Sequence, residues 1–216
     1  MGGRIPKQYL SLGGVPILVH SLRILEAVPA VRHIILAVPE AERDYCLKEI
    51  ITRYRITKVS KVVAGGERRQ DSVRHGLREV EDGAEIVLVH DAVRPLVTRE
   101  VVERVVARAE QVGAAIAGIP MRDTVKRIGA DGMIEATIDR GGMWLAQTPQ
   151  AFRLDLLRQA HHKADLERFH ATDDAQLLEW MGLAVAVVDG SEENIKITRP
   201  EDLAVGEAIL AARQKA

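Results

Sequence analysis

Short apolar, β-branched runs alternate along this chain with longer segments in which apolar residues recur every three or four positions, and this alternation constrains the fold most. The first pattern is typical of buried strands, and the second is typical of helices that cover a sheet. Strands separated by helices of this length form a mainly parallel sheet through right-handed crossovers. We therefore expect strands at residues 33–38, 59–64, 86–90 and 184–188. We expect helices at residues 16–28, 40–54, 69–80, 98–111, 154–165 and 172–181, and from residue 200 onward.

Length, charge and cysteine content set the class of protein. Residues 1–216 are enough for a single domain with a sizeable core. The 30 Lys and Arg residues balance 31 Asp and Glu residues, and only 3% of the residues are aromatic, so we expect no nucleic-acid partner. No apolar stretch reaches the ~20 residues that span a bilayer, and no signal-peptide pattern is present, so we expect no membrane partner. The single cysteine, Cys46, excludes an internal disulfide and suits the reducing cytoplasm.

Residues 122–148 follow a different pattern. Turn signals at residues 129–132 and 141–142 flank short β-type stretches at residues 124–128 and 133–138, which predicts an antiparallel hairpin. This β-arm has too little apolar content for a core of its own, and isolated hairpins are marginal in water. We expect the arm to pack on another subunit.

The stretch from Val87 to Pro95 brings an acidic and a basic side chain to the end of an expected strand. Pro95 ends the strand, and Asp91 and Arg94 stand just before it. Ligands of open α/β sheets bind at the carboxyl ends of the strands, so both side chains should face a site. A carboxylate suits Mg²⁺, and a planar guanidinium suits phosphate oxygens. The alternative is a surface Asp–Arg pair beside a turn.

Two further segments could bind anionic ligands. The loop that starts at Gly65 and Gly66 allows close approach of the backbone and leads into a helix N-terminus with unpaired N–H groups. Asp71 or Ser72 could instead be only a helix cap. Lys7 precedes a helix and could reach a phosphate as a mobile point charge, or it could simply be solvated.

Lys196 and Arg140 each have a functional and a structural interpretation. Lys196 lies between two apolar β-branched residues of a short strand, so it points to the opposite face and could line a cleft or reach solvent. Arg140 precedes two glycines on the arm, where backbone can approach a ligand, although charged residues on a hairpin are usually solvated. We expect His161 and His162 on an exposed helix face. The sequence contains no metal-ligand spacing of histidines, no Ser/His/Asp arrangement and no Walker motif.

Six segments occur in one order along essentially the whole chain. They are Pro6-Lys7-Gln8-Tyr9, Gly65-Gly66 with Arg69-Gln70-Asp71-Ser72-Val73, Val89-His90-Asp91-Ala92-Val93-Arg94-Pro95, Arg122-Asp123-Thr124, Ala146-Gln147-Thr148-Pro149-Gln150 and Asn194-Ile195-Lys196-Ile197-Thr198. Through this series the sequence resembles the 2-C-methyl-D-erythritol 4-phosphate cytidylyltransferases of the non-mevalonate isoprenoid pathway. Each motif is moderately specific alone, whereas six in register are highly specific.

The resemblance implies a Rossmann-like nucleotidyltransferase that is a homodimer through the β-arm and uses Mg²⁺. It implies transfer of CMP from CTP to 2-C-methyl-D-erythritol 4-phosphate, with release of pyrophosphate. The attacking group would be a phosphate monoester, which is already anionic near neutral pH, so no general base is needed. Catalysis would then consist of positioning two polyanions and neutralising their charge, which agrees with the absence of a catalytic His or Ser arrangement.

The resemblance also implies roles for the residues at matching positions. Lys7 would stabilise the transition state at the triphosphate, while Arg140 and Lys196 would align the attacking phosphate. Asp91 would support Mg²⁺ or the substrate hydroxyls. The nucleotide-binding residues would be Gly66, Ser72, Asp91 and Ala92. The residues that bind methylerythritol phosphate would be Arg94, Thr124, Arg140 and Lys196, with Thr124 and Arg140 completing the site of the partner subunit.

One departure from the family concerns the N-terminus. The family begins with a strand and an Ala-Ala-Gly-x-Gly-x-Arg-type loop around the triphosphate, whereas this sequence starts at Met1-Gly2-Gly3-Arg4. We expect the family's N-terminal βα unit to be absent and the strands beside it to lose ladder partners. Either Met1 is an internal methionine taken as the start, or the chain is a short form with poor CTP binding. The intact downstream motifs favour the first account, and Arg4 could partly replace the lost cation.

Two other functions stay open at this point. A ribitol-5-phosphate cytidylyltransferase would share the nucleotide motifs, although residues 139–144 and 198–203 look more like the methylerythritol enzyme. A truncated, non-catalytic dimer could bind the substrate but not CTP.

Overall fold

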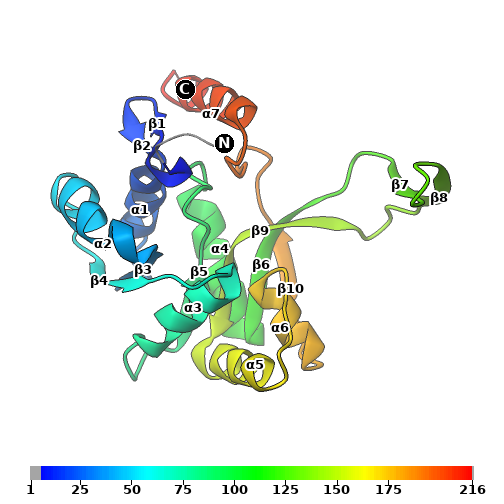
Figure 1. The fold of residues 1–216 in the computed structure, drawn as a ribbon, viewed down its shortest axis with the longest axis horizontal. Coiled ribbons are helices and arrows are strands. Elements are labelled where there is room, and N and C mark those ends of the chain that lie inside the picture. The colour runs from blue at the N-terminus through cyan, green and yellow to red at the C-terminus, as the bar shows by residue number, and fades with distance from the viewer. Residues whose placement is uncertain (1–5, 216) are drawn as a thin grey trace.

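The computed structural model describes residues 6–215 and has a central four-stranded sheet with helices on both faces (Figure 1). The order of the strands is β10–β6–β9–β5. Their bounds are Ile86–Val89 for β5, Ala114–Pro120 for β6, Trp144–Arg153 for β9 and Ala186–Asp189 for β10. The α/β class that the alternating pattern predicts is confirmed.

The strand directions differ from the expected mainly parallel sheet. β10 and β6 pair parallel, whereas β9 pairs antiparallel with both β6 and β5. The reason is that β9 returns from the β-arm and inserts between β6 and β5. The sequence pattern misses β9 because Pro149 and three polar residues interrupt its apolar run.

A separate two-stranded parallel sheet is formed by β3 (Ile34–Val38) and β4 (Val59–Ala64). Within residues 6–215, β3 pairs only with β4 and β5 pairs only with β9. The expected absence of the family's N-terminal βα unit stays a prediction. The expectations about Met1 and Arg4 lie outside the described residues.

Most of the remaining elements are helices that flank these sheets. The helices among them include η1 (Lys7–Tyr9), α1 (Ile17–Ala27), α3 (Arg69–Arg78), α4 (Arg99–Val112), α5 (Leu154–Leu166), α6 (Asp174–Trp180) and α7 (Pro200–Arg213). The two short strands are β1 (Ser11–Leu12) and β2 (Val15–Pro16). Between Pro6 and Lys215, none of the helices has both the length and the apolar character of a membrane span.

One helix prediction needs correction. The expected helix at residues 40–54 is not one α-helix, because it divides into η2 (Glu40–Glu42), α2 (Arg43–Tyr45) and the π-helix η3 (Cys46–Thr52). At the start of α7, the carboxylate of Asp202 accepts hydrogen bonds from the backbone N–H groups of Thr198 and Arg199.

Alternating side chains of β6 face two different cores. Ala115 and Ala117 contact the cluster that contains the valines of α4, whereas Ala114 and Ile116 contact the cluster beneath α5 and α6. The sheet is therefore covered on both faces, which explains why β6 is almost continuously apolar.

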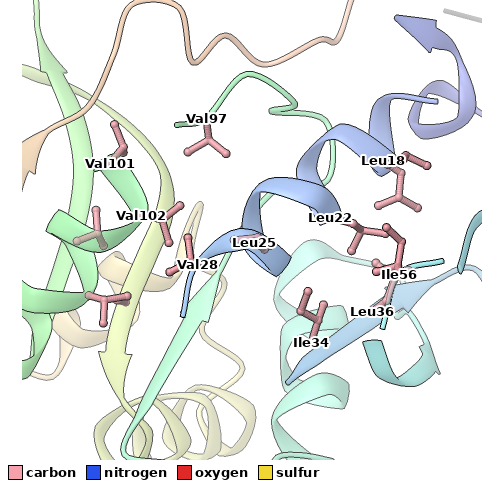
Figure 2. Packing of buried hydrophobic residues seen from close by; sticks show 14 of the residues in the cluster. Leu18, Leu22, Leu25, Val28, Ile34, Leu36, Ile56, Val97, Val101 and Val102 are labelled. Carbon is pink, nitrogen blue, oxygen red and sulfur yellow. The ribbon is translucent and has the colours of Figure 1, made fainter. Parts of the chain in front are cut away.

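The first core continues to the second sheet, where α1 packs on β3. Figure 2 shows Leu22 of α1 beside Leu36 and Ile56. Cys46 is fully buried in the same cluster, so it packs in the core.

The β-arm projects to one side of the molecule (Figure 1, right). Its tip is an antiparallel hairpin of β7 (Val125–Ile128) and β8 (Ile134–Ile138), as expected. At its base, Arg122 forms an ion pair of 2.6 Å with Glu192. Six large apolar side chains on or beside the arm are exposed, namely Ile128, Met133, Ile134, Met143, Trp144 and Leu145.

Candidate active site

A cavity of about 230 Å³ lies at the carboxyl end of β5. Asp91, Arg94 and Lys196 line it, so the structure brings together three of the expected site residues. The other lining residues are Arg69, Ala146, Gln147, Thr148, Gln150, Thr172 and Asp173. β9 contributes to this cavity because Gln150 pairs with Val89, the last residue of β5.

Asp91 is paired on both of its carboxylate oxygens. Oδ1 accepts a hydrogen bond from Arg69 Nε at 2.9 Å, and Oδ2 lies 2.7 Å from Lys196 Nζ. Burial by itself would raise the pKa of the Asp91 carboxyl. The charges and hydrogen bonds of Arg69 and Lys196 outweigh burial and hold this pKa well below its usual range. Asp91 is therefore ionised at neutral pH.

His90 and Thr148 fix the backbone around Asp91. The Thr148 hydroxyl accepts a hydrogen bond from the Asp91 N–H at 3.0 Å and donates to His90 Nδ1 at 3.2 Å. His90 Nε2 in turn donates to the carbonyl of Arg94 at 3.2 Å. Burial lowers the pKa of His90 to about 4, so the ring is neutral at neutral pH, with one donor and one acceptor nitrogen.

A buried amide network brings Lys196 to the cavity. Asn194, two residues earlier, is fully buried and donates from Nδ2 to the carbonyl of Thr148 at 2.9 Å and to Gln147 Oε1 at 3.2 Å. The backbone carbonyl of Asn194 accepts a hydrogen bond of 2.7 Å from Arg94 Nη1. These bonds tie the segment before Lys196 to β9 and to the turn after β5.

The loop between β4 and α3 is packed too tightly for a side chain at Gly66. A Cβ on Gly66 would lie 2.2 Å from Asp71 Cβ. The Gly66 N–H donates to Ser72 Oγ at 3.0 Å, and this hydroxyl donates to the carbonyl of Arg68 at 3.2 Å. Ser72 therefore holds the glycine turn against the first turn of α3, and its contact with a ligand stays a prediction.

Several expected site residues lie elsewhere. Among the described residues, those that do not line the cavity are Lys7, Gly66, Ser72, Ala92, Thr124 and Arg140. Lys7 is exposed in η1, and the carbonyl of Ala92 accepts a hydrogen bond from Ser21 at 2.9 Å. Thr124 and Arg140 are exposed on the β-arm. Ligand contact by these residues stays a prediction.

Arg69 is a cavity residue to which sequence reasoning assigns no role. Besides Asp91 it contacts Asp174, with Nη1 2.6 Å from Asp174 Oδ2. Asp174 is 105 residues away in the sequence, so no local spacing connects the two. Thr148 is also missed as a contributor, although it belongs to one of the six ordered motifs, which was the available signal.

His161 is buried, so the expectation of an exposed His161–His162 face is wrong for one of the two. It is 2% exposed, and its Nε2 lies 3.0 Å from Asp174 Oδ1, whereas His162 is exposed. Neighbouring residues on an α-helix point about 100° apart, so a histidine pair at the edge of the buried face divides between core and solvent.

The charge of the cavity suits a phosphate ligand. Three basic side chains, those of Arg69, Arg94 and Lys196, line the cavity with Asp91 and Asp173, and the buried Asp174 balances the charge of Arg69, so Arg94 and the partly exposed Lys196 are the basic groups available to a phosphate. Arginine can bind phosphate oxygens in a bidentate manner, and lysine binds them as a point charge.

The residues of the same cavity fit Mg²⁺ that is bound together with a phosphate ligand. Within residues 6–215, no three His, Cys, Asp or Glu side chains form a metal-binding group. Mg²⁺ often takes one or two protein carboxylates and completes its shell with water and substrate phosphates. Asp91 fits this role, because its partner Lys196 is 40% exposed and can move away from Oδ2.

Comparison with known proteins points to one family. The family model of 2-C-methyl-D-erythritol 4-phosphate cytidylyltransferase (IspD) matches residues 1–212. A protein of that name from Syntrophotalea carbinolica is 48% identical over 211 residues, which are 97% of this chain and 90% of the relative. Another, from Pelotomaculum thermopropionicum, is 47% identical over 214 residues, 99% of this chain and 90% of the relative.

Solved structures show the same similarity. A 4-diphosphocytidyl-2C-methyl-D-erythritol synthase from Anaerococcus prevotii aligns with a TM-score of 0.85 and 31% identity over 94% of this chain and 93% of that one. A 2-C-methyl-D-erythritol 4-phosphate cytidylyltransferase from Thermus thermophilus aligns with a TM-score of 0.82 and 33% identity, covering 95% and 94% of the two chains.

Proposed function

Because this chain belongs to the 2-C-methyl-D-erythritol 4-phosphate cytidylyltransferase (IspD) family, we propose that the cavity at Asp91 is where it transfers CMP from CTP to 2-C-methyl-D-erythritol 4-phosphate. The chain is a cytidylyltransferase, and residues 1–216 act as one nucleotidyltransferase domain. The observation that carries the proposed location is the convergence of Asp91, Arg94 and Lys196 on one cavity from distant parts of the sequence.

The reaction joins a phosphate oxygen of methylerythritol phosphate to the α-phosphorus of CTP. The bond from this phosphorus to the bridging oxygen of the β-phosphate breaks, and pyrophosphate leaves with the electron pair. The attacking phosphate is already anionic, so no side chain has to remove a proton. This fits a site in which the neighbouring His90 is neutral and donates and accepts internal hydrogen bonds. The protein positions the two polyanions and neutralises their charge.

Arg94 and Lys196 bind the phosphate of methylerythritol phosphate. Lys196, which pairs with Asp91 in the structure, turns to the attacking phosphate and aligns it. Asp91 then has a free oxygen for the substrate hydroxyls or for Mg²⁺. Bound Mg²⁺ would neutralise part of the charge on the phosphates.

CTP lies between the cavity and the glycine turn before α3. The exposed Gly66 and the hydroxyl of Ser72 bind the cytidine end, and the backbone at Ala92 binds the ribose. Lys7 stabilises the triphosphate in the transition state. The N–H groups at the start of α3 support this placement, because a helix N-terminus favours anionic and polar ligands.

The active form is a homodimer joined through the β-arm. The exposed apolar side chains of the arm support this proposal, because a cluster of that kind marks an interaction surface. Thr124 and Arg140 then reach the cavity of the partner subunit. The dimer works in the cytoplasm, where the thiol of Cys46 stays reduced.

Pyrophosphate release by the full chain tests the proposal, with CTP, Mg²⁺ and either methylerythritol phosphate or ribitol 5-phosphate. Lys196→Met removes the charge while keeping the length, and we expect kcat/KM to fall by about 100-fold or more. Lys48→Met changes an exposed lysine on η3 and should leave the rate unchanged. Pyrophosphate release with ribitol 5-phosphate alone would refute methylerythritol phosphate as the acceptor. No release with either acceptor would favour a non-catalytic binding protein. A wild-type rate in Lys196→Met would remove this lysine from the site.

A further inference from the structure

Arg69 connects two carboxylates that lie on different parts of the fold. Nε of its guanidinium donates to Asp91 Oδ1 at 2.9 Å, and Nη1 donates to Asp174 Oδ2 at 2.6 Å. A planar guanidinium can hold two carboxylates in a fixed relation, whereas a lysine ammonium has no such fork. The first residue of α3 thus ties the turn after β5 to the start of α6.

The far end of this contact is anchored in the core. Asp174 is 1% exposed, and each of its oxygens has one partner, Arg69 for Oδ2 and His161 Nε2 for Oδ1. A buried carboxylate is tolerated only when it is paired and hydrogen-bonded, so the position of Asp174 is set on both sides. His161 lies on α5, so three helices contribute to the anchor.

The two partners of Asp91 therefore differ. Lys196 has a flexible, 40% exposed side chain, whereas Arg69 is held by the buried Asp174. We propose that Arg69, Asp174 and His161 are positioning residues, which together hold Asp91 in the orientation that the acceptor substrate or its metal requires. This inference rests on the proposed function of the Asp91 cavity.

The test is a substitution that keeps the positive charge at position 69 but removes the planar guanidinium, which contacts two carboxylates at once. Arg69→Lys should raise the KM for methylerythritol phosphate and lower kcat/KM by about 10- to 100-fold, as losses of outer partners of a binding carboxylate do. The melting temperature should stay close to that of the wild type. Arg74→Lys is the matched control, because Arg74 lies on the same helix, is similarly buried and contacts two other carboxylates, Asp71 and Asp165.

A second pair of variants acts without touching the cavity. His161→Leu removes the donor to Asp174, whereas His161→Gln places an amide N–H near the position of Nε2. We expect an increased KM in His161→Leu and rescue in His161→Gln. Wild-type kinetics in both Arg69→Lys and His161→Leu would overturn the inference. So would a fall in kcat alone with a lower melting temperature, which marks a merely structural role.

Crystal structures of Asp174→Asn separate this inference from the proposed function. If the wild-type protein releases no pyrophosphate, the proposed function is refuted. The crystal structures of the variant still show whether Asp174 sets the orientation of Asp91. The inference requires the Asp91 carboxylate to rotate and lose its contact with Arg69 in the variant. An Asp91 that keeps its orientation overturns it.

Discussion

The ion pair with Lys196 balances the charge of the Asp91 carboxylate, and in the proposed function it also keeps a cation close to where the substrate phosphate binds. In the proposed function, a phosphate that enters the cavity competes with Asp91 for Lys196, because Lys196 is more exposed than Arg69, the other partner of Asp91. Arg69 has no comparable freedom, since Asp174 holds its other end. The same carboxylate thus has one exchangeable and one permanent partner, and the exchangeable one is an expected catalytic residue.

Gly66 and Gly76 have opposite packing environments, which gives the first prediction at this scale. Gly66→Ala places a Cβ 2.2 Å from Asp71 Cβ, so we expect a loss of about 1–3 kcal/mol of stability and weaker CTP binding. Gly76→Ala, inside α3, meets nothing closer than Ile35 at 3.9 Å and should stabilise the protein by about 0.5–1 kcal/mol. Urea unfolding and KM for CTP measure both effects. Equal stability of the two variants would contradict the geometry of the glycine turn.

His90 gives a pH dependence whose sign follows from its surroundings. Burial lowers its pKa from 6.5 to about 4 in the folded state, so between these values the unfolded chain binds more protons. The stability that neutral His90 contributes is fully present above about pH 6.5 and is lost as the pH falls towards 4. A pKa difference of this size corresponds to a loss of about 3 kcal/mol.

Urea unfolding between pH 7.5 and 4.5, without substrate or divalent cations, measures this loss. His90→Gln keeps an N–H that can donate to the carbonyl of Arg94 but does not titrate, so its stability should change less over this range. His162→Gln removes an exposed imidazole and should keep the wild-type profile. A wild-type profile in His90→Gln would show that another group causes the acid loss.

At the scale of elements, local patterns predicted most helices and strands because their apolar spacing is set by burial on one or two faces. β4 begins and ends at the expected residues, and α4 is offset from the expected range by one residue at each end. The failures have physical reasons. β9 contains polar residues because they point into the cavity rather than the core, so its function obscures its strand pattern. The π-helix η3 arises from hydrogen-bond geometry that apolar spacing does not encode.

The candidate site also has a part that sequence patterns predict and a part that they do not. Asp91 and Arg94 could be predicted because both stand at the end of one apolar run, where an α/β fold places ligands. The contact of Arg69 with Asp174 could not be predicted, because it depends on how α3 and α6 pack and not on a spacing within either. Burial of His161 depends on the same packing. Sequence patterns thus identify groups at strand ends, whereas the contacts that orient those groups require the tertiary structure.

At the scale of the whole molecule, the β-arm separates two sets of expected substrate residues. Arg94 and Lys196 line the cavity, whereas Thr124 and Arg140 are exposed on the arm, which projects away from the rest of the fold (Figure 1). One chain could unite them only by folding the arm back. The proposed symmetric dimer would unite them without such a change, with each arm reaching the other subunit.

This arrangement predicts that Arg140 acts in trans. Arg140→Ala alone should lower kcat/KM by about 100-fold, because it removes a cation from the attacking phosphate. Light scattering should still show a dimer, since the exposed apolar residues of the arm are unchanged. Mixed dimers, isolated with two different affinity tags, then distinguish action in trans from action in cis.

A mixed dimer with Arg140→Ala on one chain and Lys196→Met on the other concentrates both defects in one site if Arg140 acts in trans. The second site is intact, so the dimer should have about half of the wild-type activity. The reciprocal dimer, with both substitutions on one chain and a wild-type partner, then has one defect in each site and should be nearly inactive. Action in cis reverses the two results, because the wild-type chain of the reciprocal dimer would keep a complete site. An active reciprocal dimer beside an inactive first one would therefore refute a site shared between subunits.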